Sequence, residues 1–217
     1  MSWVWDHLGE IGSYAVSHAL LAGIPLVVGL ALALPLGWLA SRHPRLAPWI
    51  VGGSGLLYTI PSLALFILMP LALGSRILDS INVYAAMTIY TVALLVRTVA
   101  DALGSVPEST TLAATAMGYR RLGRALSVEL PIAVPVLASG LRVAAVSNVS
   151  IVSVASLIGY PQLGYYLMDG YQRSFPLEIV VGLVACLLLA LAFDLAIRAG
   201  EWLLTPWQRW HRHQVTP

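Results

Sequence analysis

The chain has 217 residues, of which 59% are hydrophobic and only 10% are charged, whereas soluble domains usually carry about 25% charged residues. Long apolar runs with so few charges are typical of polytopic membrane proteins, so a soluble globular fold is excluded. The net charge of +2 comes from local arginine clusters, with no lysine anywhere in the chain, which argues against nucleic-acid binding and against a Walker A loop, whose lysine contacts nucleotide phosphates.

The first predicted element is a short helix within residues 1–18, lying on the membrane surface. Hydrophobic residues recur there at near-helical spacing among polar ones, at Trp3, Leu8, Ile11 and Ala15. This pattern predicts an interfacial helix, with a frayed tail as the alternative. Because no basic residue precedes the first apolar run, we do not expect a cleaved signal peptide.

Five apolar segments approach or exceed the length of about 20 residues that a membrane-spanning helix needs. They are Ala19–Ala40, Val51–Leu73, Val83–Leu103, Ile132–Ile158 and Leu177–Ile197. An odd number of spans predicts termini on opposite faces of the membrane. We therefore expect an all-α polytopic membrane protein, with the whole of residues 1–217 as one transmembrane domain.

Arginine placement predicts the orientation, because cytoplasmic loops retain positive charge. Eight arginines end or follow spans one, three and five: Arg42, Arg45, Arg120, Arg121, Arg124, Arg198, Arg209 and Arg212. Only Arg76 and Arg173 fall on the opposite side. The prediction is an N-terminus outside, and a cytoplasmic loop over residues 104–131 and a cytoplasmic tail over residues 205–217.

Four prolines lie inside the first two predicted spans: Pro25, Pro35, Pro61 and Pro70. Each removes a backbone donor at membrane depth, where only protein or a water-filled path can satisfy the freed carbonyl. Ordinary kinks explain any one of them, but together they favour a transporter over a simple anchor. No internal repeat of the spans is evident, which weakens an inverted-repeat secondary transporter.

The predicted cytoplasmic loop contains a small-residue helix followed by a basic segment. The run from Pro107 to Gly118 is followed, after nine residues, by Val128-Glu129-Leu130-Pro131. Small residues at 113, 114 and 118 keep one helix face low, so that the helix can enter a groove on a partner. Gly118 is expected to end the helix or reverse the chain, a role that glycine fills without strain.

This spacing resembles the EAA loop of ABC importer permeases, with Leu112 in place of the usual glutamate. The resemblance implies a helix that docks on a cytoplasmic ATPase, which would bind ATP and Mg, while this chain is non-catalytic and binds no cofactor. The coupling residues implied are Leu112, Ala113, Ala114, Met117, Gly118, Tyr119, Arg120 and Arg121. A generic loop helix that packs only on its own protein is the alternative.

Other segments resemble permeases for osmoprotectants such as glycine betaine, choline and carnitine. They are Thr59-Ile60-Pro61-Ser62-Leu63-Ala64, Val96-Arg97-Thr98, Val128–Val136 and Ile158–Gly164. The last departs from the family's glycine-rich version, so we expect an outer loop of different shape. The resemblance spans roughly residues 18–200. It implies the type I ABC importer permease fold in the bacterial plasma membrane, paired with a second permease copy or paralogue and an extracytoplasmic binding protein.

Polar and aromatic residues inside the spans are candidates for the translocation path: Tyr58, Pro61, Ser62, Tyr90, Arg142 and Asn148. An arginine at the bilayer centre costs about 2.5–3.5 kcal/mol, so Arg142 should face protein or water. Span four is predicted to line the path, with helix packing of its serines as the alternative. Two pairs four residues apart, Arg97 with Asp101 and Asp194 with Arg198, are placed to pair on one helix face.

The resulting hypothesis is an osmoprotectant import permease powered by a separate ATPase. A methionine or polar amino-acid ABC permease stays open, since these share the EAA loop. A stand-alone carrier driven by an ion gradient and a membrane scaffold without transport are the competing classes. No catalytic residue and no metal site are expected, because the lone Cys186 and the histidines near the termini lack the required spacing.

Overall fold

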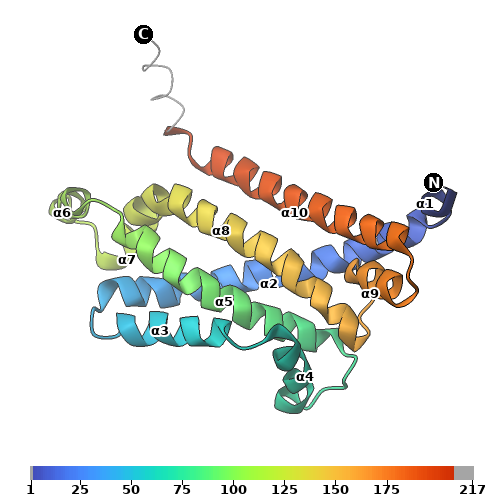
Figure 1. Cartoon of the computed structure of the whole chain (residues 1–217). Coiled ribbons are helices and arrows are strands. Elements are labelled where there is room, and N and C mark those ends of the chain that lie inside the picture. Colours follow the sequence, from blue (N-terminus) through green and yellow to red (C-terminus); the bar gives the residue numbers. More distant parts are fainter. Residues whose placement is uncertain (1, 208–217) are drawn as a thin grey trace, which may run out of the picture.

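The computed structural model describes residues 2–207, and over this range the secondary structure is entirely helical (Figure 1). Four segments are long and apolar enough to cross a membrane. They are α2 (Leu8–Arg42), α5 (Ser80–Gly104), the stretch Arg121–Ile158 and α10 (Pro176–Leu204). A fifth crossing is made if the bent pair α3 (Ala47–Tyr58) and α4 (Ser62–Leu73) counts as one span. The all-α polytopic fold is confirmed.

Shorter elements lie at the ends of these spans. The long stretch Arg121–Ile158 contains α7 (Arg121–Arg124), a π-helical turn (Ala125–Glu129), α8 (Leu130–Ser153) and a 3-10 turn (Val154–Ile158). The remaining helices are α1 (Ser2–Asp6), α6 (Glu108–Ala116) and α9 (Gly164–Gln172). The predicted tail begins where α10 ends at Leu204, and most of it lies outside the described residues.

The N-terminal prediction needs a correction. Residues 8–18 do not form a separate surface helix but continue into the first span as α2, a helix of 35 residues that is about 52 Å long. The reason is local, since no proline interrupts the chain between His7 and Pro25. His18 is fully buried, and its Nε2 lies 2.9 Å from the Val149 carbonyl of α8. This contact of His18 with α8 holds residues 8–18 in line with the rest of α2.

The second predicted span is also wrong as one continuous helix. The chain bends by 102° between α3 and α4, and each half has 12 residues, about 18 Å, which is shorter than the hydrocarbon core. Pro61 lacks an N–H, which removes one helical hydrogen bond and favours a break at this position. The Tyr90 hydroxyl of α5 donates to the Ile60 carbonyl at the break. That bond satisfies a backbone group that would otherwise be unpaired at membrane depth.

Helices α2 and α5 pack closely because glycines on α2 face α5. A Cβ at Gly29 would lie 2.5 Å from Thr91 Cγ2, and one at Gly37 would lie 2.5 Å from Val99 Cβ. Small residues at such contacts let two membrane helices approach until their backbones nearly touch. The glycines of α2 therefore set the spacing of the central helix pair.

We expect Gly37→Ala to destabilise the protein by about 1–3 kcal/mol, because the added methyl group overlaps Val99. Gly12→Ala is the matched control on the same helix, since a Cβ there meets no atom within 4 Å. The measurement is the unfolding midpoint of both variants in detergent micelles. Equal midpoints for the two variants would contradict this account of the α2–α5 contact.

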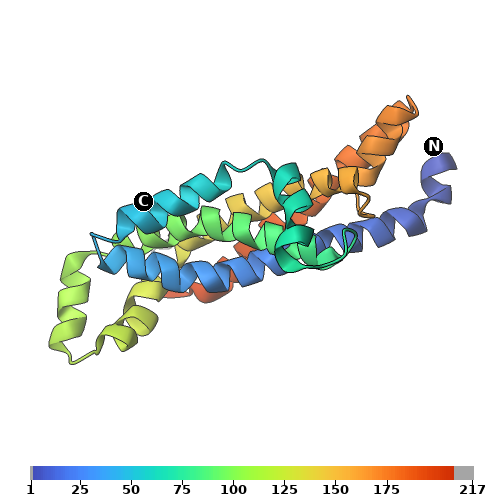
Figure 2. The same cartoon turned by 90° about the horizontal axis from the view of Figure 1, so that it is seen from below.

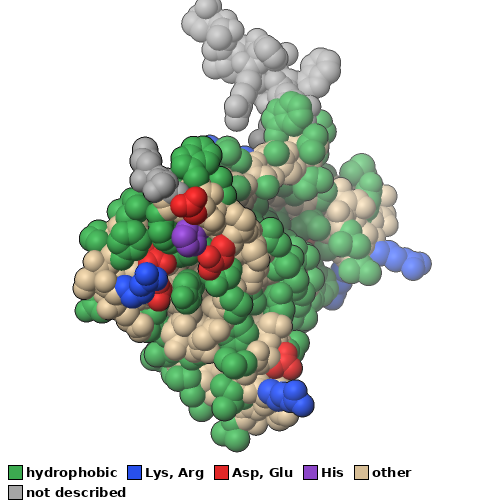
Figure 3. Space-filling model, turned by 90° about the vertical axis from the view of Figure 1, so that its right-hand side faces the viewer, with side chains coloured by type: hydrophobic (Ala, Val, Ile, Leu, Met, Phe, Trp, Pro, Cys, Tyr) green, Lys and Arg blue, Asp and Glu red, His purple; other side chains and the backbone are tan. Residues whose placement is uncertain are grey.

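The bundle has two distinct ends, which the two cartoon views agree on (Figures 1 and 2). At one end, called the α6 end, lie α6, α7 and the C-terminal ends of α2 and α5. At the other, the α9 end, lie α1, α9 and the start of α10. Figure 3 views the α9 end, where hydrophobic side chains dominate and a few charged ones gather between them. The first helix and the last turn of α10 therefore lie at opposite ends of the bundle.

Candidate functional site

Helix α6 ends at Ala116, and the chain reverses at Gly118, as the sequence predicts. Gly118 has φ +87°, a left-handed conformation that glycine adopts without strain. The Gly118 N–H donates to the Thr115 carbonyl (3.0 Å), and the Tyr119 N–H donates to the Ala114 carbonyl (3.2 Å). This is the Schellman arrangement of a helix C-terminus, and it reverses the chain so that α7 can return toward the bundle.

The outer surface of α6 and of the turn after it is apolar and is not covered by other residues of the chain. Leu112 is 62% exposed and Met117 is 71% exposed. Ala113 and the side chains of Tyr119, Arg120 and Arg121 are exposed as well, whereas Ala114 is buried against the chain's own residues. The α6 end therefore presents large apolar side chains beside two guanidinium groups, which suits contact with another protein.

An ion-pair cluster lies directly behind α6. Glu129 is buried, and its two carboxylate oxygens pair with Arg42 at the end of α2 and with Nε of Arg124 (2.7 Å). Arg124 Nη1 also donates to Thr115 Oγ1 of α6 (2.6 Å). We call Arg42, Arg124 and Glu129 the Glu129 cluster. It joins α6, α7, α2 and the start of α8 through charged hydrogen bonds.

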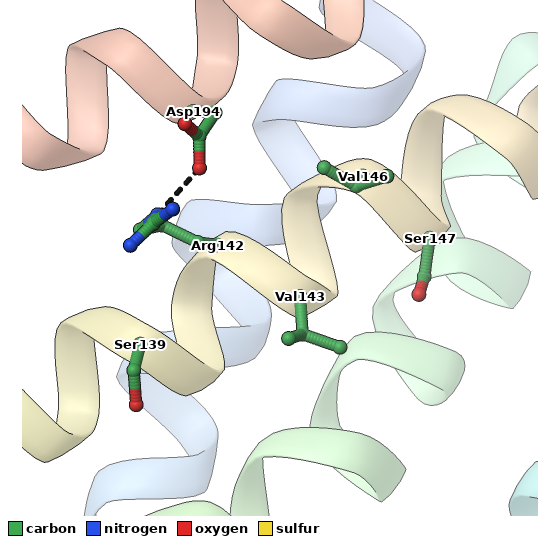
Figure 4. Close-up of a pocket in the computed structure, with 6 residues that line it drawn as sticks. All are labelled: Ser139, Arg142, Val143, Val146, Ser147 and Asp194. Atoms are coloured by element: carbon green, nitrogen blue, oxygen red, sulfur yellow. Dashed lines mark hydrogen bonds and ion pairs between the residues drawn. The ribbon is translucent and has the colours of Figure 1, made fainter.

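A second ion pair lies at membrane depth between α8 and α10. Arg142 donates through Nε to Asp194, and Asp194 also accepts from Arg198 Nε at 2.8 Å. The pair borders a pocket of about 400 Å³, whose lining residues are Ser139, Arg142, Val143, Val146, Ser147 and Asp194 (Figure 4). As Figure 4 shows, the Arg142 side chain reaches from α8 toward the Asp194 side chain of α10. Of the two environments predicted for Arg142, protein or water, its guanidinium contacts protein here.

Two other predicted path residues, Asn148 and Tyr90, are buried among neighbouring helices in this structure. Asn148 is buried in the core of the chain, where its Nδ2 donates to Thr91 Oγ1 (2.9 Å) and to the Ala22 carbonyl (3.2 Å). Tyr90 is also buried, and its hydroxyl donates to the Ile60 carbonyl at the α3–α4 break. In this conformation neighbouring helices satisfy both polar groups, which stabilises them within a helix bundle.

The remaining path candidates gather at the α3–α4 break. Tyr58 and Pro61 are exposed, and Ser62 is partly buried at the start of α4. The Tyr58 ring lies edge-on to the Tyr90 ring with centroids 5.8 Å apart. The break therefore brings an exposed aromatic ring beside an interruption of the helix.

The α9 end carries the loops between spans. Asp169 of α9 pairs with Arg173 Nη1 at 2.9 Å, and this carboxylate raises the pKa of the Arg173 guanidinium. The Tyr160 hydroxyl donates to the Asp79 carbonyl, which ties the segment after α8 to the start of α5. Burial raises the pKa of Tyr160 above that of a free phenol.

Sequence reasoning missed the partners of several charged residues. The two pairs expected on single helices form, Arg97 with Asp101 (3.7 Å) and Arg198 with Asp194 (2.8 Å). The contacts of Arg142 with Asp194 and of Glu129 with Arg42 join residues 52 and 87 positions apart. The only sequence signal for the Glu129 ion pairs was the presence of a lone carboxylate beside the start of a predicted span. Over residues 2–207, no group of three acidic, histidine or cysteine side chains is placed to hold a metal ion.

Comparison with known families identifies the class of protein. Residues 26–209 match the family described as the inner membrane component of binding-protein-dependent transport systems. The chain belongs to this family. It is therefore a multi-pass membrane permease subunit of an ABC importer, and the sequence-based prediction of the family is confirmed.

Curated relatives of this permease align over almost its whole length. The osmoprotectant import permease protein OsmW of Salmonella typhimurium is 34% identical over 204 residues, covering 93% of this chain and 94% of that protein. The carnitine transport permease protein OpuCB of Listeria monocytogenes is 29% identical, covering 87% of this chain and 85% of the relative. The choline transport system permease protein OpuBB of Bacillus subtilis is 27% identical, with 91% and 90% covered.

Solved structures show the same fold. A chain of the MetNI methionine ABC transporter, in an inward-facing conformation, superposes with a TM-score of 0.79 and covers 92% of the permease and 98% of that chain. The identity is 18%, so the likeness concerns the fold alone. The predicted type I ABC importer permease fold is confirmed.

Proposed function

We propose that the permease imports osmoprotectants of the glycine betaine, choline and carnitine class. The observation that carries this substrate class is the near full-length similarity to relatives named for osmoprotectant, carnitine and choline transport. The methionine alternative has support only from a fold match at 18% identity. An ion-gradient carrier has no comparable use for the exposed helix at the α6 end.

In this proposal α6 docks on a cytoplasmic ATPase that binds ATP and Mg, and the permease itself catalyses no reaction. Leu112, Met117 and Tyr119 supply apolar contact area, and Arg120 and Arg121 supply charge. The α6 end is then cytoplasmic, as the arginine distribution predicts. The N-terminus lies outside the cell, and an extracytoplasmic binding protein delivers solute at the α9 end.

The translocation path forms where the permease pairs with a second copy or a paralogue. Support comes from α8, whose exposed face at membrane depth carries Ser139 and borders the Arg142–Asp194 pocket. Hydroxyl and charged groups on such a face suit contact with water or solute better than contact with lipid tails. Tyr58, Pro61 and Ser62 at the helix break complete the proposed lining.

The test is solute-stimulated ATP hydrolysis in proteoliposomes that contain the permease, its co-purifying ATPase and the binding protein. Glycine betaine, choline and methionine are offered separately. We expect stimulation by the quaternary amines and no response to methionine. Stimulation by methionine alone would show that the substrate is methionine and not an osmoprotectant. The absence of any associated ATPase would favour a carrier driven by an ion gradient.

A further inference from the structure

The Glu129 cluster is unusual because it buries a carboxylate at the inner end of a membrane helix. The Glu129 side chain is 1% exposed, whereas those of Arg42 and Arg124 are 30% and 17% exposed. A buried charge persists only where well-placed partners compensate its lost hydration. Here the partners come from two separate elements, the C-terminal turn of α2 and helix α7, so the carboxylate holds both to the start of α8.

Arg124 extends the cluster to the exposed helix. Its guanidinium donates to Glu129 through Nε and to Thr115 Oγ1 of α6 through Nη1. The Thr115 hydroxyl is held in turn, because it donates to the Thr111 carbonyl (2.7 Å) on its own helix. A continuous chain of hydrogen bonds therefore runs from α6 through Arg124 to the buried carboxylate.

The backbone between these groups departs from regular helix. Residues Ala125–Glu129 form a π-helical turn, and Glu129 is its last residue before α8. Single π-turns inside longer helices often mark functional sites. The side-chain cluster spans this turn, so it links α6 to the start of α8 by a route separate from the backbone.

We propose that the Glu129 cluster transmits displacement of α6 to the inner ends of α2 and α8. The inference rests on the proposed function, in which an ATPase moves α6. Thr115, Arg124, Glu129 and Arg42 are positioning residues, since they act on the path through α2 and α8. Without the cluster, α6 still docks and moves, but α8 no longer follows it.

The experiment compares Thr115→Val, Arg124→Gln and Glu129→Gln in the complete transporter, reconstituted with its ATPase and binding protein. Thr111→Val is the matched control, because the Thr111 hydroxyl only donates to the Glu108 carbonyl of its own helix (2.8 Å). The readouts are co-purification of the ATPase, ATP hydrolysis, and glycine betaine taken up per ATP hydrolysed.

We expect Arg124→Gln and Thr115→Val to keep the ATPase bound and hydrolysing, while uptake per ATP falls by about fivefold or more. Thr111→Val should match the unsubstituted protein. An unchanged ratio in both Arg124→Gln and Thr115→Val would overturn the proposal, and these two variants decide it even where Glu129→Gln does not fold. Failure of the proposed function is distinguishable, because the unsubstituted permease would then bind no ATPase.

Discussion

Gly118→Val is expected to weaken docking of the ATPase by about 10- to 100-fold, since left-handed strain of this kind costs of order 1–3 kcal/mol. Gly118 has φ +87°, a conformation that is an outlier for a β-branched residue. Valine would force the turn after α6 into another shape, and the Schellman bonds of Gly118 and Tyr119 would be lost. The exposed side chains around the turn would then no longer match one partner surface.

Gly123→Ala provides the control for that prediction. Gly123 lies in α7 of the same loop, its φ is not positive, and an added Cβ meets nothing within 4 Å. The measurement is the affinity between purified ATPase and permease in nanodiscs, by surface binding, together with the unfolding midpoint of each variant. Unchanged affinity in Gly118→Val would show that the shape of this turn does not matter for docking.

Arg142→Gln is expected to lower the apparent unfolding temperature by about 5 °C or more, because Asp194 would lose its partner from α8. The carboxylate would keep only Arg198, which lies on its own helix and is 56% exposed. Removing one member of an ion pair at membrane depth leaves an uncompensated charge, which is worse than removing both. The double variant Arg142→Gln with Asp194→Asn should therefore recover most of the lost stability.

Transport by that double variant separates a structural role of the pair from a role in the path. If the two groups line the path, uptake stays low although the fold is restored. If they only fasten α8 to α10, uptake returns with stability, and the path assignment of Arg142 fails. Arg97→Gln is the control, because the Arg97–Asp101 pair is 3.7 Å long and about three-quarters exposed, and such pairs contribute little to stability.

The sequence alone determined the membrane fold, the family and the end of α6. The length and hydropathy of an apolar run do not depend on how the helices pack. The four long spans were therefore predictable from the sequence. Gly118 was predictable because the left-handed turn is a local requirement of two or three residues. The pairs Arg97–Asp101 and Asp194–Arg198 followed from helical spacing for the same reason.

The tertiary structure decided where helices break and which distant charges meet. A proline at membrane depth is compatible with a kink or with a full break, and at Pro61 the carbonyl freed by the break is satisfied by the Tyr90 hydroxyl of another helix. A polar residue in a span, such as Asn148, needs hydrogen-bond partners, and the packing of α2, α5 and α8 decides which ones it finds. The Glu129 and Arg142 contacts join residues far apart in sequence, so no local pattern encodes them.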